Sequence, residues 1–308
     1  MKQTTSTILM VRPANFGFNA QTAVSNAFQH NDTSLSIKDI KELAVTEFDE
    51  FVKKLRSNGI SIIVAQDSKS PVKPDAVFCN NWISTHENGT MILYPMLTEN
   101  RRLERQSYVI DLIRNNYNVK RYLDFSEHED LGQILEGTGS MILDRVNRLV
   151  YACLSPRTDS ELLNKFCEWA EYEKVVFHSV DSHGQEIYHT NVMMAMGDEF
   201  VVICMESIRD KAERKTLLNY FEKTEKTVID LTMKQIEAFA GNMLQVENKD
   251  GKTFLVMSEQ AYKSLKQDQI DLIEQFTTIL YAPIYTIEKY GGGSARCMMA
   301  EVFLTKKG

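Results

Sequence analysis

The sequence lacks several features that readily assign a protein to a class. Its five cysteines are an odd number and contain no Cys-x-x-Cys spacing. A disulfide framework and a zinc ribbon are therefore disfavoured, and a reducing, cytoplasmic location is expected. No apolar run approaches the length that crosses a membrane, and the run 8–11 near the amino terminus is too short for a signal-peptide core.

The sequence also has no excess of positive charge and no common metal or nucleotide motif. The formal net charge is −7, so neither a nucleic acid nor an anionic membrane is an expected partner. His-Glu-x-x-His, paired histidines at metal-ligand spacing and a phosphate-loop lysine are all absent. No metal site is predicted.

What remains is an ordinary globular composition, 43% hydrophobic and 25% charged, with ample material for a core. No linker or low-complexity stretch interrupts the chain. The sequence predicts a single domain over residues 1–308.

Short apolar runs alternate with helical patterns from end to end, which predicts a mixed α/β fold. The strands are expected at Ile8–Val11, Ser61–Ala65, Ala76–Cys79, Met91–Tyr94, Ser140–Leu143, Leu149–Leu154, Val175–Phe177, Val192–Met196, Phe200–Cys204, Thr253–Met257 and Ala300–Leu304. The helices are expected at Glu99–Asn116, from a capping box at Thr158, at Arg209–Glu225 and at Ser258–Phe276.

Many strand pairs arrive as hairpins, with Asn88-Gly89 as a strong turn signal. Repeated units of hairpin, helix and strand are therefore favoured over a doubly wound parallel sheet. Their spacing of roughly fifty to sixty residues is typical of a repeat architecture.

The most informative segment is Gly291-Gly292-Gly293 followed by Cys297. Glycines let another group approach the backbone closely, and a cysteine thiolate is a nucleophile. Such a loop suggests covalent catalysis if a histidine and a carboxylate serve the sulfur. The alternative is a buried cysteine that packs as a small apolar residue.

Three further elements could complete a cysteine site. Glu136 lies at a strand end beside Gly137 and Gly139, His189 precedes an apolar run, and Asn80-Asn81 ends the run 76–79. Each has a structural alternative, because Asn and Glu often serve turns. Five other histidines, at positions 30, 86, 128, 178 and 183, compete with His189.

The order of these elements resembles the pentein superfamily, which includes arginine deiminase, dimethylarginine dimethylaminohydrolase, succinylarginine dihydrolase and the amidinotransferases. The resemblance spans the chain from 11–13 to Phe303 and includes Leu154-Ser155-Pro156-Arg157-Thr158 and Gly241-Asn242-Met243-Leu244. It implies a five-bladed α/β propeller of ββαβ-type modules with its site on the central axis.

The resemblance also implies residue roles. Cys297 matches the nucleophile, His189 the general acid/base and Glu136 the carboxylate that serves the site. Arg157 matches an arginine that holds the substrate's α-carboxylate. Arg101 or Arg102 resembles an assisting arginine of the dimethylarginine enzymes, with an exposed helix surface as the alternative.

The chain departs from the arginine deiminases at two positions, where Asn81 and Asn191 replace acidic residues. A guanidinium is a donor-only cation whose natural partner is a carboxylate, whereas a ureido group is neutral and has a carbonyl acceptor. With Asn80 beside them, these amides favour citrulline over arginine. The chain is similar to the citrulline-utilisation hydrolases, although succinylarginine dihydrolase handles a guanidinium with an asparagine-rich site.

The expected reaction is hydrolysis of citrulline to ornithine, ammonia and carbon dioxide through S-carbamoyl-Cys297, without a metal or organic cofactor. The alternatives are an arginine, methylarginine or succinylarginine hydrolase, an amidinotransferase, and a non-catalytic module such as the pentein-fold translation initiation factor. The expected partner is a small amino-acid substrate, and a homodimer is the assembly considered.

Overall fold

The computed structural model describes residues 1–308, and its strands form five three-stranded sheets with one shared internal order. In each sheet an antiparallel pair is followed by a parallel strand. The sheets are β15 (Ala300–Glu301)–β1 (Thr7–Arg12)–β2 (Ser61–Gln66), β3 (Ile83–Thr85)–β4 (Thr90–Leu93)–β5 (Arg121–Asp124), β6 (Ile142–Asp144)–β7 (Leu149–Cys153)–β8 (Glu173–Phe177), β9 (Met194–Met196)–β10 (Phe200–Ile203)–β11 (Thr227–Asp230) and β12 (Leu244–Glu247)–β13 (Thr253–Ser258)–β14 (Thr278–Ala282).

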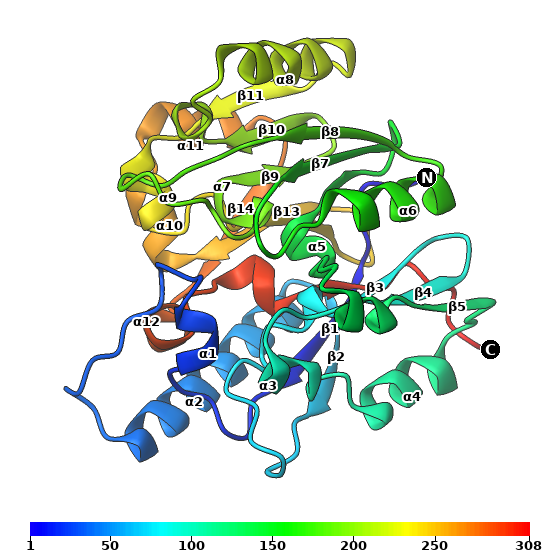
Figure 1. Cartoon of the computed structure of the whole chain (residues 1–308), viewed down its shortest axis with the longest axis vertical. Helices are drawn as coiled ribbons and strands as arrows, with labels where there is room; N and C mark the ends of the chain where they lie inside the picture. Colours follow the sequence, from blue (N-terminus) through cyan, green and yellow to red (C-terminus); the bar gives the residue numbers. More distant parts are fainter.

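A helical crossover joins the two parallel strands of each sheet, because parallel neighbours cannot be connected by a tight turn. The crossovers contain α2 (Ile37–Ser57), α4 (Ser107–Asn116), α6 (Ser160–Ala170), α8 (Lys211–Lys223) and the pair α10 (Glu259–Ser264) and α11 (Gln267–Glu274). In Figure 1 α2, α4, α6 and α8 lie on the outside, and the red carboxyl-terminal segment crosses the middle. The predicted architecture of five ββαβ-type modules is confirmed.

The two ends of the chain close the arrangement. β15 pairs antiparallel with β1, with Leu9 opposite Ala300, so the carboxyl terminus supplies the first strand of the amino-terminal module. The central strands are almost fully buried, as β1, β7 and β10 illustrate. Strands buried on both faces read as continuous apolar runs, which is why these were visible in the sequence.

Two predicted strands are wrong at the positions that matter for the site. The run Ala76–Cys79 forms a turn that leads into the 3₁₀ helix η1 (Cys79–Asn81), and the predicted strand Val192–Met196 begins with the short helix α7 (Thr190–Met193). Both runs are buried at the centre of the molecule. A short buried run has no periodicity that separates a strand from a helical turn.

Helix boundaries also differ from the predictions. The expected helix Glu99–Asn116 is two helices, α3 (Glu99–Arg102) and α4, and Ser258–Phe276 likewise divides into α10 and α11. The residue that caps α6 is Asp159 rather than Thr158, with its side chain accepting from the Leu162 N–H at 2.8 Å. The longest helix, α2, was not predicted, although Ser36 and Asp39 form its capping box.

The hairpin signal at Asn88-Gly89 is confirmed between β3 and β4, where Gly89 has a φ of +90°. None of the helices combines the length and the apolar character needed to cross a membrane.

Candidate active site

A ring of short helical turns surrounds the axis, one immediately before the inner strand of each module. The turns are η1, α5 (Gly137–Ser140), α7, the turn at 238–241 and η4 (Ala295–Met298). Contacts run from η1 to α5, from α5 to α7 and from η4 back to η1. The Asn242 amide closes the remaining gap, because it donates to the Asn191 carbonyl at 2.9 Å and to the Cys297 sulfur at 3.2 Å.

Cys297 lies on η4 and is buried, but its sulfur faces polar groups. The side-chain amides of Asn191 and Asn242 point N–H donors at Sγ over 3.4 and 3.2 Å. The Cys297 N–H in turn donates to Asn242 Oδ1 at 3.3 Å. Two donors aimed at a sulfur stabilise the anion more than the thiol.

The other cysteines have the inert environment expected of core residues. Burial raises their thiol pKa to about 11 or 12, and this holds for Cys79, Cys153, Cys167 and Cys204. All five cysteines are free.

His189 and Glu136 form a buried pair. His189 is the residue immediately before α7, and its Nε2 lies 2.8 Å from Glu136 Oε2. The carboxylate accepts the Nε2 proton, so Nδ1 is the nitrogen left for proton transfer. Burial lowers the pKa of His189 to about 4, although the hydrogen bond and charge of Glu136 act in the opposite direction. The imidazole is therefore neutral at pH 7 and can act as a base.

Glu136 itself is held ionised. Burial acts to raise its pKa, but the charge of Arg157, the hydrogen bond from His189 and the charge of Arg101 outweigh burial and bring the pKa below its usual range. Its second oxygen accepts the Leu97 N–H at 3.0 Å. Glu136 therefore lies behind His189 as a fixed negative charge.

These values predict the acid side of the pH profile. With His189 as the general base that the sequence predicts, only its neutral form accepts a proton, so kcat/KM should fall as the pH drops through about 4, rather than near 6.5 where an ordinary histidine titrates. Glu136→Gln removes the carboxylate that raises the His189 pKa, so this limb should move to lower pH. Rate profiles from about pH 2 to 8 provide the measurement.

The matched control is His178→Gln, because His178 is an exposed histidine that also pairs with a glutamate, Glu213, at 2.8 Å. It should leave the profile unchanged. An acid limb near 6.5 in the unaltered protein would contradict the assignment of His189.

The two predicted arginines are both buried and both reach the site, but through different partners. Arg157 donates to Ser25 Oγ at 2.7 Å and to the Thr22 carbonyl at 3.2 Å, and it lies 3.4 Å from Glu136. Its guanidinium also stacks over the Tyr188 ring at 4.8 Å. Arg157 therefore joins the site to the amino-terminal segment 13–36.

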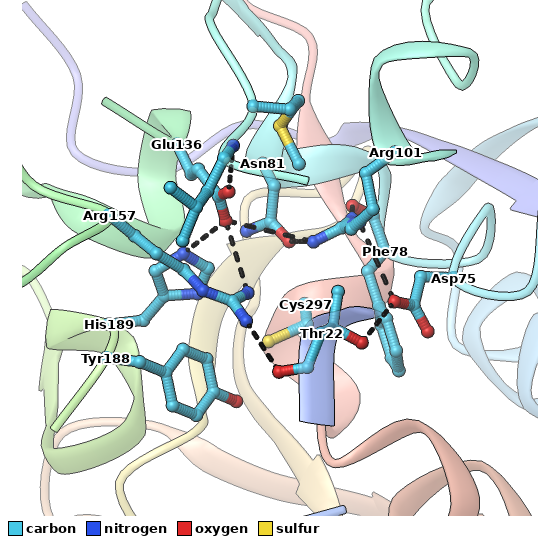
Figure 2. A network of polar contacts seen from close by, with 12 residues as sticks. Thr22, Asp75, Phe78, Asn81, Arg101, Glu136, Arg157, Tyr188, His189 and Cys297 are labelled. Carbon is cyan, nitrogen blue, oxygen red and sulfur yellow. Dashed lines mark hydrogen bonds and ion pairs between the residues drawn. The ribbon is translucent and has the colours of Figure 1, made fainter. Parts of the chain in front are cut away.

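Arg101 is engaged by protein groups. It makes a two-pronged ion pair with Glu104, with both N–O distances 2.9 Å, and donates to Asn81 Oδ1 at 2.9 Å. Burial acts to lower the Arg101 pKa, but Glu104 and Asp75 together raise it above its usual range. Arg101 thus fixes the orientation of the Asn81 amide (Figure 2).

The oxygen of the Asn81 amide is hydrogen-bonded, whereas its nitrogen has no hydrogen-bond partner. Because a guanidinium has only donors, Oδ1 must face Arg101, and this leaves Nδ2 as a buried donor without a partner. Asn191 is the reverse: its Nδ2 faces Cys297, and its buried Oδ1 has no partner. Asn80 instead bonds Thr138 Oγ1 at 3.2 Å and does not line the cavity described below.

Two residues of the site were not among the predicted ones. Asn242 contacts the sulfur directly, and the segment 241–244 had been noted only for its resemblance. Asp75 is fully buried; its Oδ2 accepts from Asn19 at 2.7 Å, whereas its Oδ1 has no hydrogen-bond partner. The signal for Asp75 was a carboxylate immediately before the apolar run 76–79 that leads to Asn80-Asn81.

Several of these groups line one small cavity. Its lining includes Cys297, His189, Asn81, Asp75 and Arg157, and Figure 2 shows the sulfur, the imidazole and the Arg157 guanidinium around the same space. The cavity has a volume of about 10 Å³, which is room for roughly one water molecule.

The segment 13–36 covers this cavity and is fastened to its charged residues. Asn19 and Thr22 hydrogen-bond to Asp75, and Ser25 holds Arg157. A ligand larger than water must displace these contacts to enter.

The glycine run has a packing role that the sequence did not predict. A Cβ on Gly291 would lie 2.6 Å from Phe78 Cζ, and one on Gly293 would lie 2.9 Å from Phe78 Cε1. The absence of side chains there lets the Phe78 ring press against the loop that leads to Cys297. The Tyr188 hydroxyl donates to the Gly292 carbonyl at 2.6 Å and holds the same loop.

Comparison with known proteins assigns this chain to a family. The family described as N,N dimethylarginine dimethylhydrolase, eukaryotic, matches residues 12–304. No curated protein matches the chain in sequence.

The similar solved structures are at low sequence identity. The apo structure of ArgZ, an arginine dihydrolase from the ornithine-ammonia cycle in cyanobacteria, superposes with a TM-score of 0.74 at 16% identity, covering 98% of this chain and 41% of ArgZ. This chain thus spans about two fifths of that protein. The ArgZ amino-terminal domain, covalently bound to a reaction intermediate, gives a TM-score of 0.73 at 17% identity over 96% and 97% of the two chains. A dimethylarginine dimethylaminohydrolase adduct gives 0.65 at 12% identity over 96% and 99%. The pentein fold is confirmed.

Proposed function

The chain belongs to the N,N-dimethylarginine dimethylhydrolase family, whose members are hydrolases of carbon–nitrogen bonds, and from this premise we propose that it hydrolyses the ureido group of citrulline. Cys297 is the proposed nucleophile, and the products are ornithine, ammonia and carbon dioxide. We take residues 1–308 as one catalytic domain.

The observation that carries this proposal is the free Nδ2 donor of Asn81. Arg101 holds Oδ1, so the amide can offer only N–H groups to a ligand. A guanidinium is also donor-only and would place N–H against N–H, which leaves both groups unsatisfied in a buried site. A ureido group presents a carbonyl oxygen, which accepts from Nδ2. Asn191 does not line the cavity but lies beside the Cys297 sulfur, and its free Oδ1 would accept an N–H of a ureido group bound at that sulfur.

The charged residues of the cavity suit the other end of an α-amino acid. Asp75 offers a free carboxylate oxygen to an ammonium group, and Arg157 offers a guanidinium to a carboxylate. Both side chains now hold the segment 13–36. Substrate binding would exchange these contacts for contacts with the amino acid.

The proposed reaction begins when neutral His189 takes the proton of the Cys297 thiol. The thiolate attacks the ureido carbon, and the negative charge that moves to the oxygen is stabilised by Asn81 Nδ2. Protonated His189, facing ionised Glu136, then gives its proton to the leaving nitrogen as the C–N bond breaks. With ornithine leaving first, the remaining species is S-carbamoyl-Cys297.

Hydrolysis of that intermediate repeats the same steps. His189 removes a proton from water, the hydroxide adds to the carbamoyl carbon, and the C–S bond breaks. The product is carbamate, which decomposes to ammonia and carbon dioxide. No step requires an oxidant, a metal or an organic cofactor.

A guanidino substrate is the second candidate, and specific observations favour it. The family and the neighbour ArgZ are named for methylarginine and arginine hydrolysis. Asp75 also places an unpaired carboxylate oxygen in the cavity, which a cationic group could bind. Against it stands the orientation of Asn81.

The test is side-by-side turnover of citrulline, arginine, methylarginine and succinylarginine, with ornithine and citrulline quantified. Citrulline should give ornithine at the highest kcat/KM. Conversion of arginine to citrulline, with citrulline itself inert, would overturn the substrate assignment. A product that forms only when glycine is added would indicate an amidinotransferase, and complete inertness would favour a binding module.

Asn81→Asp gives the sharper prediction. The carboxylate has no donor for the ureido oxygen, so kcat/KM for citrulline should fall by about 10²-fold or more, as for loss of one oxyanion donor. Any turnover of arginine should rise. The matched control is Asn88→Asp in the exposed β3–β4 turn, which should change neither substrate. Equal loss with both substrates would show that Asn81 does not distinguish them.

We further propose a reducing, cytoplasmic location, in line with five free cysteines. We also propose a homodimer, and light scattering would measure the molar mass of the assembly.

A further inference from the structure

A second small cavity is lined by residues of the ring of turns and of the inner strands β6, β9, β12 and β15. Thr138, Met243 and Arg296 line it, and each is the immediate neighbour in sequence of a residue on the active-site side: Gly139, Asn242 and Cys297. Residues from four of the five modules contribute to its wall. The turns therefore have two faces, each with its own polar chemistry.

The second face carries two buried arginines and one glutamate. Arg145 and Arg296 are each 4% exposed. Both contact Glu301 on β15, with Arg296 Nη2 2.9 Å from Oε2 and Arg145 Nη2 3.5 Å from Oε1. These three are the charged residues among those that line the cavity.

The charges of this group do not balance. Arg296 also donates to the Met299 carbonyl at 2.7 Å, but the Arg145 guanidinium has no carboxylate partner closer than Glu301 and otherwise stacks over Phe303 at 4.0 Å. The neighbouring Asp144 is already paired with Lys226 at 3.5 Å. Two cations share one anion, which leaves a net charge of +1 in a buried site. Buried charges are ordinarily paired, because desolvating an uncompensated ion is costly.

We propose that this cavity is a binding site for a small monovalent anion, held between Arg145 and Arg296. The cavity has a volume of about 20 Å³, which is room for one or two groups of the size of a water molecule. A halide or bicarbonate has the required charge and size, whereas a bulky or doubly charged anion does not. The bound anion would link η4 and β15, which close the ring, to the third module.

Two small anions with a single negative charge fit this site, and they have different sources. Chloride comes from the medium, and bicarbonate forms from the carbon dioxide of the proposed reaction. The bicarbonate source rests on the proposed function, whereas the chloride source does not. Both are tested without substrate or turnover, so a failure here is separate from a failure of the citrulline assignment.

The experiment is thermal unfolding at fixed ionic strength and pH 8 in sodium gluconate, chloride or bicarbonate. Binding only to the folded chain raises the Tm in proportion to ln(1 + [L]/Kd). We expect a saturable rise of about 2 °C over gluconate at tenfold excess over Kd. A rise with chloride identifies the medium as a source, and one with bicarbonate alone identifies the product. Equal Tm values in all three salts would overturn the proposal.

Two variants should move the effect in opposite directions. Arg145→Gln removes one cation, so the anion-dependent rise should disappear. Glu301→Gln removes the competing carboxylate, so the same rise should occur at a several-fold lower anion concentration. Bromide soaked into crystals should give an anomalous peak within about 3.5 Å of both guanidiniums. Water alone at that position, or unchanged anion dependence in both variants, would refute the site.

Discussion

Replacing Cys297 with alanine is expected to abolish turnover of every substrate while leaving the fold intact. The sulfur is the only proposed nucleophile, and no other thiol lines the cavity. Loss of a covalent nucleophile costs far more than loss of a binding contact, so kcat should fall by on the order of 10⁴-fold or more. Ornithine release from citrulline at high enzyme concentration measures the residual rate.

Binding should survive in the same variant. The donors that now face the sulfur, from Asn191 and Asn242, remain in place. Citrulline should therefore still raise the Tm of Cys297→Ala, and its crystals should retain the unreacted substrate. The matched control is Cys167→Ala on α6, which removes a thiol outside the site and should preserve activity. Full activity in Cys297→Ala would eliminate the thiolate mechanism.

The second large effect is expected from Gly139→Ala, a change of one methyl group on α5. The added Cβ would overlap Asn81 Nδ2 and would lie 2.8 Å from both Cε1 and Nδ1 of His189. Both obstacles are side chains rather than backbone, so the fold can adjust by moving them. Moving them displaces the proposed ureido donor and the proposed general base together, and a shift of about 1 Å can reduce the rate by about 10²-fold.

The distinguishing result is a large loss of kcat/KM, of about 10²-fold or more, with a small change in Tm. The control is Gly17→Ala, where a Cβ meets no atom within 4 Å. Kinetics and thermal unfolding on the same preparations provide both readouts. If Gly139→Ala retained full activity, the close approach of Asn81 and His189 to α5 would not be needed for catalysis.

Much of the architecture could be predicted from the sequence. The buried central strands read as apolar runs, and Asn88-Gly89 marked a hairpin. The spacing of hairpins and helices indicated a repeat, which the five sheets confirm. Some errors lie away from the axis, since the outer strands β5, β11 and β14 were not predicted. The errors that affect the site lie at the axis, where 76–79 and 192–193 were predicted as strand but form turns or a short helix. Short segments buried among neighbouring modules take their conformation from those neighbours, so local pattern is a poor guide there.

The site was predictable in composition but not in arrangement. Cys297, His189 and Glu136 were identified from motif order, and the structure brings them together with Asn81, Asn191 and Arg157. Asp75 and Asn242 were missed as site residues, although Asp75 directly precedes the apolar run 76–79 and Asn242 lies in a segment that resembles the family. Asn80 was grouped with Asn81, yet its amide bonds Thr138.

The sequence by itself determined the repeating modules, the buried strands and the residue types that can attack and protonate a carbon–nitrogen bond. These properties follow from hydrophobic periodicity and side-chain chemistry, which are local. Only the tertiary structure decided which polar atoms remain free. Arg101 turns the Asn81 oxygen away from a ligand and leaves its N–H groups available. That choice depends on a contact between two segments of the fold, and it is the basis for proposing a ureido rather than a guanidino substrate.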